Sequence, residues 1–113
     1  MKYLLLGAIT EAGQQLSPTD LEAWMAEIGA WSEKHATTGT LADPGHQLDW
    51  PDKAKTIRAT GVTDGPYIEA KEVLAGYSLL ETPGIDEAVE VAQTWPGVDR
   101  GWIVMEVRPV MAQ

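Results

Sequence analysis

The segment from Ser17 to Gly39 restricts the fold most, because it carries start and stop signals for one amphipathic helix. Ser17 can cap the helix, Pro18 suits its first turn, and Asp20 stands where a capping-box acid belongs. The stripe that follows recurs at intervals of three and four residues: Leu21, Trp24, Met25, Ile28 and Trp31, with His35 one turn further on. Gly39 is expected to mark the C-terminal end of this helix. The segment is therefore predicted to be a helix with one buried face.

The segments on either side of this helix follow strand and helix patterns. Residues 3–9 are almost wholly apolar, which is typical of a strand buried on both faces. Residues 74–81 and 101–110 are predicted to be two further strands. Between them, residues 85–95 repeat an apolar stripe with helical spacing, and a Pro-Gly pair ends it.

The remaining residues carry turn and loop signals. Residues 10–16 are polar around a glycine and are expected to form a loop. Residues 40–53 contain two proline breaks, which predict an irregular excursion with a short strand near Gln47 and Leu48. Residues 55–63 alternate weakly about a Thr-Gly turn, which predicts a hairpin. The order β-α-β-β-(β)-α-β is the α+β, ferredoxin-like split βαβ arrangement, with two helices on one face of an antiparallel sheet.

Two helices cover only one face of such a sheet, so the other face needs a separate cover. Trp102 and Val104 of the last strand are expected on the uncovered face, together with half of the side chains of residues 3–9. An apolar face of this kind marks an interaction surface. The simplest cover is a second copy related by a two-fold axis, which predicts a homodimer by sheet-on-sheet packing. A loop from residues 40–53 lying over the face is the monomeric alternative.

Length and composition exclude several classes of protein and site. The 113 residues fit a single domain, 1–113, and the absence of cysteine excludes disulfides, iron–sulfur clusters, thiolate zinc sites and a cysteine nucleophile. A net charge of −9 repels phosphate backbones and anionic membranes, so neither nucleic acid nor membrane is an expected partner. No apolar run reaches transmembrane length. A reducing cytoplasm is compatible with this composition and is the expected location.

His46 is the first candidate for chemistry, because it lies in a loop between two carboxylates, Asp43 and Asp49. Such carboxylates can orient a histidine as a general base; a surface histidine in a turn-rich loop is the alternative. A metal site built from these three residues and His35 is a further alternative. Its spacing matches no recognised ligand pattern, so no metal is predicted.

Asp64 is the second candidate, and it too has two interpretations. It precedes Gly65, and an aspartate before glycine commonly caps the backbone of its own turn. Alternatively, its carboxylate is held at a strand end and faces the cleft between the sheet and a partner. Trp50, beside Pro51 in a loop, is expected to line a pocket or the rim of the dimer.

The stretch TDGPYIEAKEVLAGYSLLE, residues 63–81, resembles the signature of the DGPF branch of the YCII-related superfamily. Asp64, Gly65 and Pro66 match its central motif, and Tyr67 stands where the family usually has Phe. The match continues through Glu69, Lys71, Glu72, Gly76 and Tyr77. The opening MKYLLL, the closing MEVRPV and the helical IDEAVEVAQTWP also resemble parts of the family. The resemblance implies a dimeric α+β barrel in the bacterial cytoplasm.

The resemblance also implies where function should be sought. Most family members have no assigned reaction, whereas some relatives are small-molecule enzymes, including a dehydrochlorinase of chlorinated aromatics. In that wider group a His near the start of the first helix pairs with an Asp on a strand. Here the start of that helix has no histidine, so the pair cannot be carried over. DGPF domains also occur fused to, or encoded beside, extracytoplasmic-function sigma factors.

The expected function is the binding of a small organic molecule in a cleft between the sheet and its partner, with acid–base chemistry that needs no redox cofactor. His46 and Asp64 are the candidate catalytic residues. The candidate ligand-binding residues are Arg58, Tyr67, Lys71 and Tyr77. One alternative is a non-enzymatic interaction or regulatory module linked to sigma-factor control of transcription. Another is a structural dimer whose pocket is vestigial.

Overall fold

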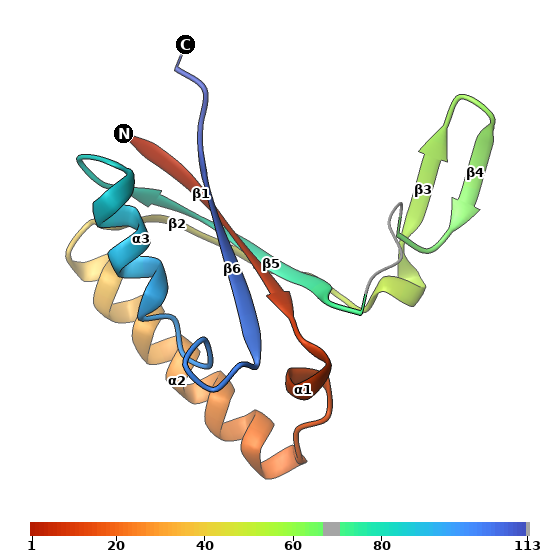
Figure 1. Cartoon of the computed structure of the whole chain (residues 1–113), viewed down its shortest axis with the longest axis horizontal. Coiled ribbons are helices and arrows are strands. Elements are labelled where there is room, and N and C mark those ends of the chain that lie inside the picture. The colour runs from red at the N-terminus through yellow and green to blue at the C-terminus, as the bar shows by residue number, and fades with distance from the viewer. Residues whose placement is uncertain (67–70, 113) are drawn as a thin grey trace.

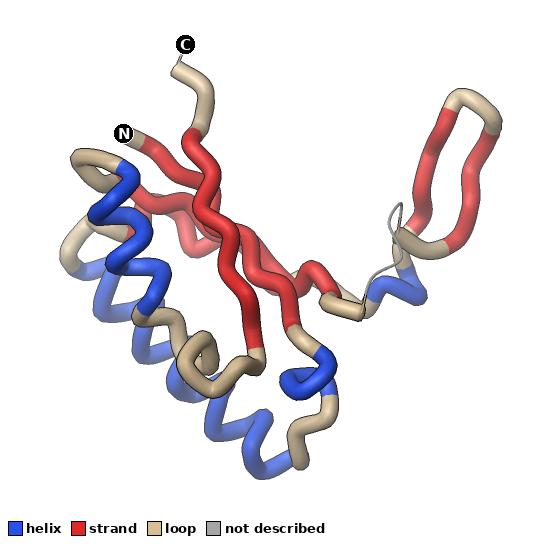
Figure 2. Tube along the Cα trace, in the orientation of Figure 1, coloured by secondary structure: helices blue, strands red, loops and turns tan. Residues whose placement is uncertain are grey.

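The computed structural model describes residues 1–66 and 71–112. They form a four-stranded sheet with two main helices on one face, and a hairpin that stands apart (Figure 1, Figure 2). The strands are β1 (Lys2–Ile9), β2 (Leu41–Gln47), β3 (Lys55–Arg58), β4 (Gly61–Asp64), β5 (Val73–Glu81) and β6 (Ile103–Pro109). The helices are α1 (Glu11–Gln14), α2 (Pro18–Thr37) and α3 (Ile85–Gln93), with a short 3-10 helix, η1 (Pro51–Lys53).

The main sheet has the strand order β2-β5-β1-β6, and each neighbouring pair is antiparallel. Because β5 lies between β1 and β2, the β1-α2-β2 unit is split by one strand, as in the ferredoxin-like arrangement. α2 and α3 cover the same face of the sheet (Figure 1). The predicted fold class is confirmed for the single chain, whereas the dimeric barrel stays a prediction.

α2 confirms the helix predicted after Ser17. The Ser17 hydroxyl accepts a hydrogen bond from the Asp20 backbone N–H at 3.1 Å, which satisfies one donor of the first turn. The helix packs into a core with buried members Tyr3, Leu5, Trp31, Leu41, Leu80, Ala88 and Ala92. No helix in the described part of the chain has both the length and the apolar character of a membrane span.

The face of the sheet away from the helices is open. Along β1, Tyr3 and Leu5 are buried against the helices, whereas Leu4 and Leu6 on the other face are only half-buried. Val104 of β6 is exposed on that open face, as expected. The prediction of a first strand buried on both faces is therefore wrong for the single chain, since two helices leave the second face uncovered.

Trp102 does not lie on the open face, which corrects its predicted position. Its ring meets that of Trp24 on α2 in an edge-on contact, with ring centroids 5.5 Å apart. The strand β6 begins only at Ile103, so the alternation of faces does not extend back to residue 102.

The loop predicted over residues 10–16 contains the short helix α1. The Thr10 hydroxyl caps this helix by accepting the Gly13 backbone N–H at 3.1 Å. Gly13 allows α1 to pack closely, since a Cβ at this position would lie 2.2 Å from the Trp102 carbonyl oxygen. The prediction of a loop is wrong here because the cap and this close contact support a helical turn.

The irregular excursion predicted over residues 40–53 begins instead with the edge strand β2. Shifts of register between Leu41 and His46 accommodate the Asp-Pro-Gly sequence, and Gly45 adopts a φ of 63°. A strand start near Leu41 and a short strand near Gln47 were expected, and both lie in β2. The prediction of an irregular course between them is wrong, because β5 supplies a pairing partner that the local pattern does not reveal. Residues 41–47 are thus part of the sheet and do not cover its open face.

β3 and β4 form the predicted hairpin, with its turn at residues 59 and 60. The hairpin is a sheet of its own and pairs with no strand of the main sheet. Figure 2 shows it standing away from the body of the protein.

Candidate functional site

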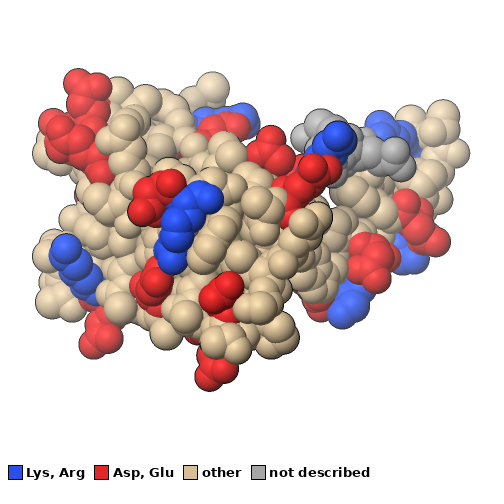
Figure 3. Space-filling view, turned by 60° about the horizontal axis from the view of Figure 1, so that its bottom comes forward, with Lys and Arg blue, Asp and Glu red and all other residues tan. Residues whose placement is uncertain are grey.

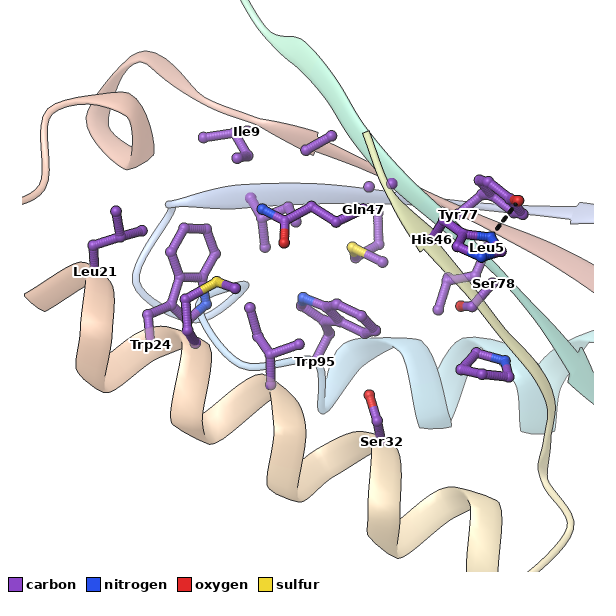
Figure 4. Close-up of a pocket in the computed structure, with 18 residues that line it drawn as sticks. Leu5, Ile9, Leu21, Trp24, Ser32, His46, Gln47, Tyr77, Ser78 and Trp95 are labelled. Carbon is purple, nitrogen blue, oxygen red and sulfur yellow. Dashed lines mark hydrogen bonds between the residues drawn. The ribbon is translucent and has the colours of Figure 1, made fainter. Parts of the chain in front are cut away.

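A pocket of about 170 Å³ lies between the sheet and α2. α2 lines it with Trp24, Met25 and Ile28, which belong to the apolar stripe predicted from the sequence. The facing wall comes from strands of the main sheet, including Leu5 of β1 and Met105 of β6 (Figure 4). The apolar stripe of α2 therefore does not close completely against the sheet.

Two glycines lie side by side in the wall of this pocket. Gly7 of β1 and Gly76 of β5 are cross-strand partners, and both line the pocket. A Cβ atom on Gly7 would lie 3.1 Å from Ile103 Cδ1 and 3.4 Å from Met105 Sδ, within the pocket wall. A Cβ atom on Gly76 would lie 3.1 Å from the His46 carbonyl oxygen of the neighbouring strand, so both glycines allow close packing at the pocket wall.

Trp95 lines the pocket and carries an unpaired donor. Its indole Nε1 is buried and has no hydrogen-bond acceptor among the residues that the structure describes. The other indole N–H groups nearby are paired: Trp24 donates to the Pro96 carbonyl at 2.7 Å, and Trp31 donates to Thr94 Oγ1 at 2.9 Å. An unpaired buried donor costs about 1–3 kcal/mol. The pocket is therefore suited to a molecule that brings a hydrogen-bond acceptor.

The remaining described polar residues of the pocket include no carboxylate, lysine or arginine. Ser32 of α2, Gln47 of β2 and Ser78 of β5 contribute to its lining, and so do His46 of β2 and Tyr77 of β5. Figure 4 shows the Gln47 side chain directed from the sheet into the space between sheet and helix. No Asp, Glu, Lys or Arg side chain of the described residues lines the pocket. A neutral molecule therefore fits it better than an ion, which would need a charged partner.

His46 and Tyr77, which also line the pocket, form a pair on the strands β2 and β5. They are cross-strand partners in β2 and β5, and His46 Nδ1 lies 3.0 Å from Tyr77 Oη (Figure 4). Tyr77 also pairs with Leu6 of β1, whose side chain lies on the open face. Both side chains are exposed. A histidine in contact with a phenol can give or take a proton, so the pair is a candidate acid–base site.

Asp64 and Arg58 lie on the hairpin, apart from this pair. Asp64 ends β4, its side chain is 83% exposed, and its carboxylate forms an ion pair with Lys55 across the hairpin. Arg58 ends β3 on the same hairpin. Neither residue contributes to the pocket beneath the sheet.

Lys71 is exposed and lies 3.9 Å from the carboxylate of Glu11 on α1. Its backbone carbonyl accepts a hydrogen bond from the Gln14 side chain at 2.8 Å. Tyr67 lies outside the described residues. The single chain brings the candidates His46 and Tyr77 into direct contact.

His35 packs as a helix side chain rather than lining the pocket. Its ring lies 4.5 Å from the Trp31 ring. Burial lowers the pKa of His35, and the neighbouring charge of Lys34 lowers it further, so the neutral imidazole is favoured. Within the described residues, no cluster of three or more His, Asp or Glu side chains is placed to hold a metal ion.

The sequence pattern places Trp95 on a helical stripe and Gln47 in a short strand, and it does not reveal that both line one pocket. The available signal is weak: Gly7 and Gly76 each interrupt an apolar strand. Only the pairing of β1 with β5 places these two glycines side by side. Trp50 does line a groove, as expected, but that groove lies at the root of the hairpin.

Known proteins resemble this chain in sequence and in fold. The model of the YCII-related domain matches residues 1–112. An uncharacterised protein of Rhizobium meliloti (strain 1021) is 32% identical over 93 residues, covering 79% of this chain and 74% of that protein. The solved 5-chloro-2-hydroxyhydroquinone dehydrochlorinase of Burkholderia phenoliruptrix AC1100, in complex with 2,5-dihydroxybenzoquinone, has a TM-score of 0.50 and 15% identity. That similarity covers 100% of this chain and 96% of the enzyme chain, and it supports the fold alone.

Proposed function

The chain belongs to the family of YCII-related domains, and on this premise we propose that it binds a small, neutral organic molecule in the pocket between the sheet and α2. The observation that carries the proposal is the pocket of about 170 Å³, lined by Trp95 with its buried, unpaired N–H. An apolar cavity of about 150 Å³ is large enough to bind benzene. The pocket therefore has room for a single ring with one hydrogen-bond acceptor.

The solved relative supports this class of ligand. The dehydrochlorinase was solved with 2,5-dihydroxybenzoquinone, a single-ring compound that carries hydrogen-bond acceptors. The shared fold supports a ring of that size as a ligand here. It does not extend to the reaction, because the start of α2 lacks the histidine expected of such enzymes.

A pocket-filling variant tests the proposal. Ser32→Leu enlarges a side chain in the pocket wall, whereas Glu33→Leu adds the same side chain at an exposed position of the same helix. Binding of cyclohexanone and phenol is measured from shifts of the indole N–H signals in proton–nitrogen NMR spectra. We expect binding to be lost in Ser32→Leu and kept in Glu33→Leu. Equal binding by both variants, or no binding of either probe by the wild-type protein, contradicts the proposal.

A second function is favoured by the contact of 3.0 Å between His46 and Tyr77. We propose that this pair performs acid–base chemistry on a small molecule bound beside it, where both residues line the pocket. A second copy is expected to complete the cleft there. His46 would exchange the proton, and Tyr77 would hold the ring of His46 in position through the hydrogen bond. This chemistry needs no redox cofactor.

Proton exchange at the carbons beside the carbonyl of cyclohexanone, followed by NMR in heavy water, tests the second function. A positioned general base accelerates such a step by about 10²–10⁴-fold, so His46→Gln should reduce exchange to the buffer rate. Tyr77→Phe should slow exchange and alter its pH profile. His35→Gln is the matched control, because it removes the other histidine from the helix-covered face. Exchange by His46→Gln at the wild-type rate would exclude the pair.

The other expectations stay predictions. They are the sheet-packed homodimer, the cytoplasmic location, and the alternative role as a regulatory module linked to sigma factors. Gel filtration with light scattering tests the first of these, since a chain of 12.3 kDa and its dimer are readily distinguished.

A further inference from the structure

A second cavity of about 490 Å³ adjoins the pocket between the sheet and α2. We call it the vestibule, and its own walls include Leu16, Leu48, Asp49 and Trp50. Six residues line both cavities: Ile9, Leu21, Trp24, Met25, Gln47 and Ala75. Figure 4 shows three of these, Ile9, Leu21 and Trp24, at one end of the pocket. The two cavities therefore share a wall there, and a molecule in the pocket has room to extend into the vestibule.

The walls of the vestibule are largely apolar, and several of them face solvent. The exposed apolar side chains that line it are 42–53% exposed: Leu21, Leu48, Trp50 and Leu74. Leu16, in the segment between α1 and α2, lines the vestibule from a half-buried position and does not line the pocket. Exposed apolar side chains gathered around one cavity mark a binding surface, because covering them removes apolar area from water. The vestibule therefore favours an apolar group.

The charge in the vestibule is already compensated. Asp49 is the one charged residue of the described lining. Its carboxylate accepts hydrogen bonds from Lys53 Nζ at 3.0 Å and from the Trp50 backbone N–H at 2.8 Å, so a cationic ligand would compete with Lys53. An anionic group is disfavoured as well, because the chain has a net charge of −9 and Figure 3 shows acidic side chains scattered over the face that it displays. A neutral group fits the vestibule best.

We propose that the molecule bound in the pocket carries a neutral alkyl chain that lies in the vestibule, against Leu16 and Trp50. This inference rests on the proposed binding of a neutral ring in the pocket, and it narrows the class of ligand. The ring presents a hydrogen-bond acceptor to Trp95 Nε1, and the chain replaces water over the exposed apolar side chains of the vestibule. Burial of one methylene group strengthens binding about fourfold, so a partly covered four-carbon chain should strengthen it at least about tenfold.

Two ring ketones that differ only in the chain, cyclohexanone and 4-butylcyclohexanone, test the proposal. Their dissociation constants for the wild-type protein are measured from shifts of the indole N–H signals in proton–nitrogen NMR spectra. We expect 4-butylcyclohexanone to bind at least about tenfold more tightly than cyclohexanone. It should also shift the indole signal of Trp50, which a Trp50→Phe variant identifies by its loss. Cyclohexanone, which has no chain, should leave the Trp50 signal in place.

A matched pair of variants separates the vestibule from the rest of the surface. Leu16→Glu places a carboxylate in the vestibule wall, whereas Gln15→Glu adds the same charge at the neighbouring exposed position, which lines neither cavity. The gain from the chain is the dissociation constant of cyclohexanone divided by that of 4-butylcyclohexanone. This gain should fall several-fold in Leu16→Glu, because the chain would desolvate a charge, and keep its wild-type value in Gln15→Glu. Equal gains in the two variants overturn the proposal, because the chain would then bind elsewhere.

The two ketones also distinguish a failure of this inference from a failure of the proposed function. If cyclohexanone binds and the butyl chain adds no affinity, the chain in the vestibule is overturned, while the binding of a ring in the pocket stands. If neither ketone binds to the wild-type protein, both are overturned.

Discussion

Replacing Thr94 by valine should leave the indole N–H of Trp31 without its acceptor. In the native protein, Trp31 Nε1 donates to Thr94 Oγ1 at 2.9 Å, and that hydroxyl donates to the Val91 carbonyl at 2.6 Å. Valine has nearly the shape of threonine, so the change removes hydrogen bonds with little change in packing. An unpaired buried donor costs about 1–3 kcal/mol. Because Thr94 is exposed and water reaches it, the lower part of that range, about 1–2 kcal/mol, is expected.

In a domain of this size, a loss of about 1–2 kcal/mol lowers the melting temperature by roughly 4–10 °C. Scanning calorimetry of the wild type, Thr94→Val and Thr94→Ser measures this shift, and the serine variant is the control because it keeps the hydroxyl. Equal melting temperatures for the two variants would refute the reasoning. They would also weaken the significance of the unpaired N–H of Trp95, since an unpaired indole donor would then cost little.

Three other substitutions test the pocket, the response to pH and a glycine turn. Trp95→Phe should weaken binding of cyclohexanone by about 2–10-fold through the loss of one hydrogen bond. It should leave binding of methylenecyclohexane, which has no oxygen, unchanged in the same NMR titration; equal losses would indicate packing instead. The pKa of His35 is lowered in the folded chain from its usual 6.5, so the unfolded chain takes up a proton first as the pH falls. Stability should therefore be complete above about pH 6.5 and decline below it. His35→Gln should flatten that decline in urea unfolding, and an unchanged slope would exclude His35 as its source. Gly97→Ala should lose more stability than Gly101→Ala in urea. Both glycines have positive φ, but only at Gly97 would a Cβ lie 2.7 Å from Trp24 Nε1; equal losses would argue against that contact.

The helix α2 could be predicted from local sequence signals alone. Its cap at Ser17, its apolar spacing and its end near Gly39 all lie within one continuous segment, so neighbouring residues suffice to predict it. The hairpin of β3 and β4 is local in the same sense, because its turn joins strands that are adjacent in sequence. The sequence pattern and the structure agree for these elements, and they also agree for β5, α3 and most of β6.

β2 shows where local signals fail. Asp43-Pro44-Gly45 has strong turn chemistry, yet this stretch lies within a strand, because pairing with β5 outweighs the local preference. Trp102 was expected on the open face by strand alternation, but β6 begins one residue later and Trp102 contacts Trp24. Both errors concern contacts with residues distant in sequence.

For the candidate site too, the residue types are known from the sequence, whereas their contacts are known only from the structure. The sequence alone singles out His46 and Tyr77 as chemically capable residues, and it determines the order of elements from which the ferredoxin-like sheet is built. Only the tertiary structure decides that these two side chains meet, since they are 31 positions apart and belong to different strands. The pocket is decided by tertiary structure for the same reason. It requires Gly7 and Gly76 to be cross-strand partners opposite α2, and the register between strands is a property of the packed sheet rather than of either segment.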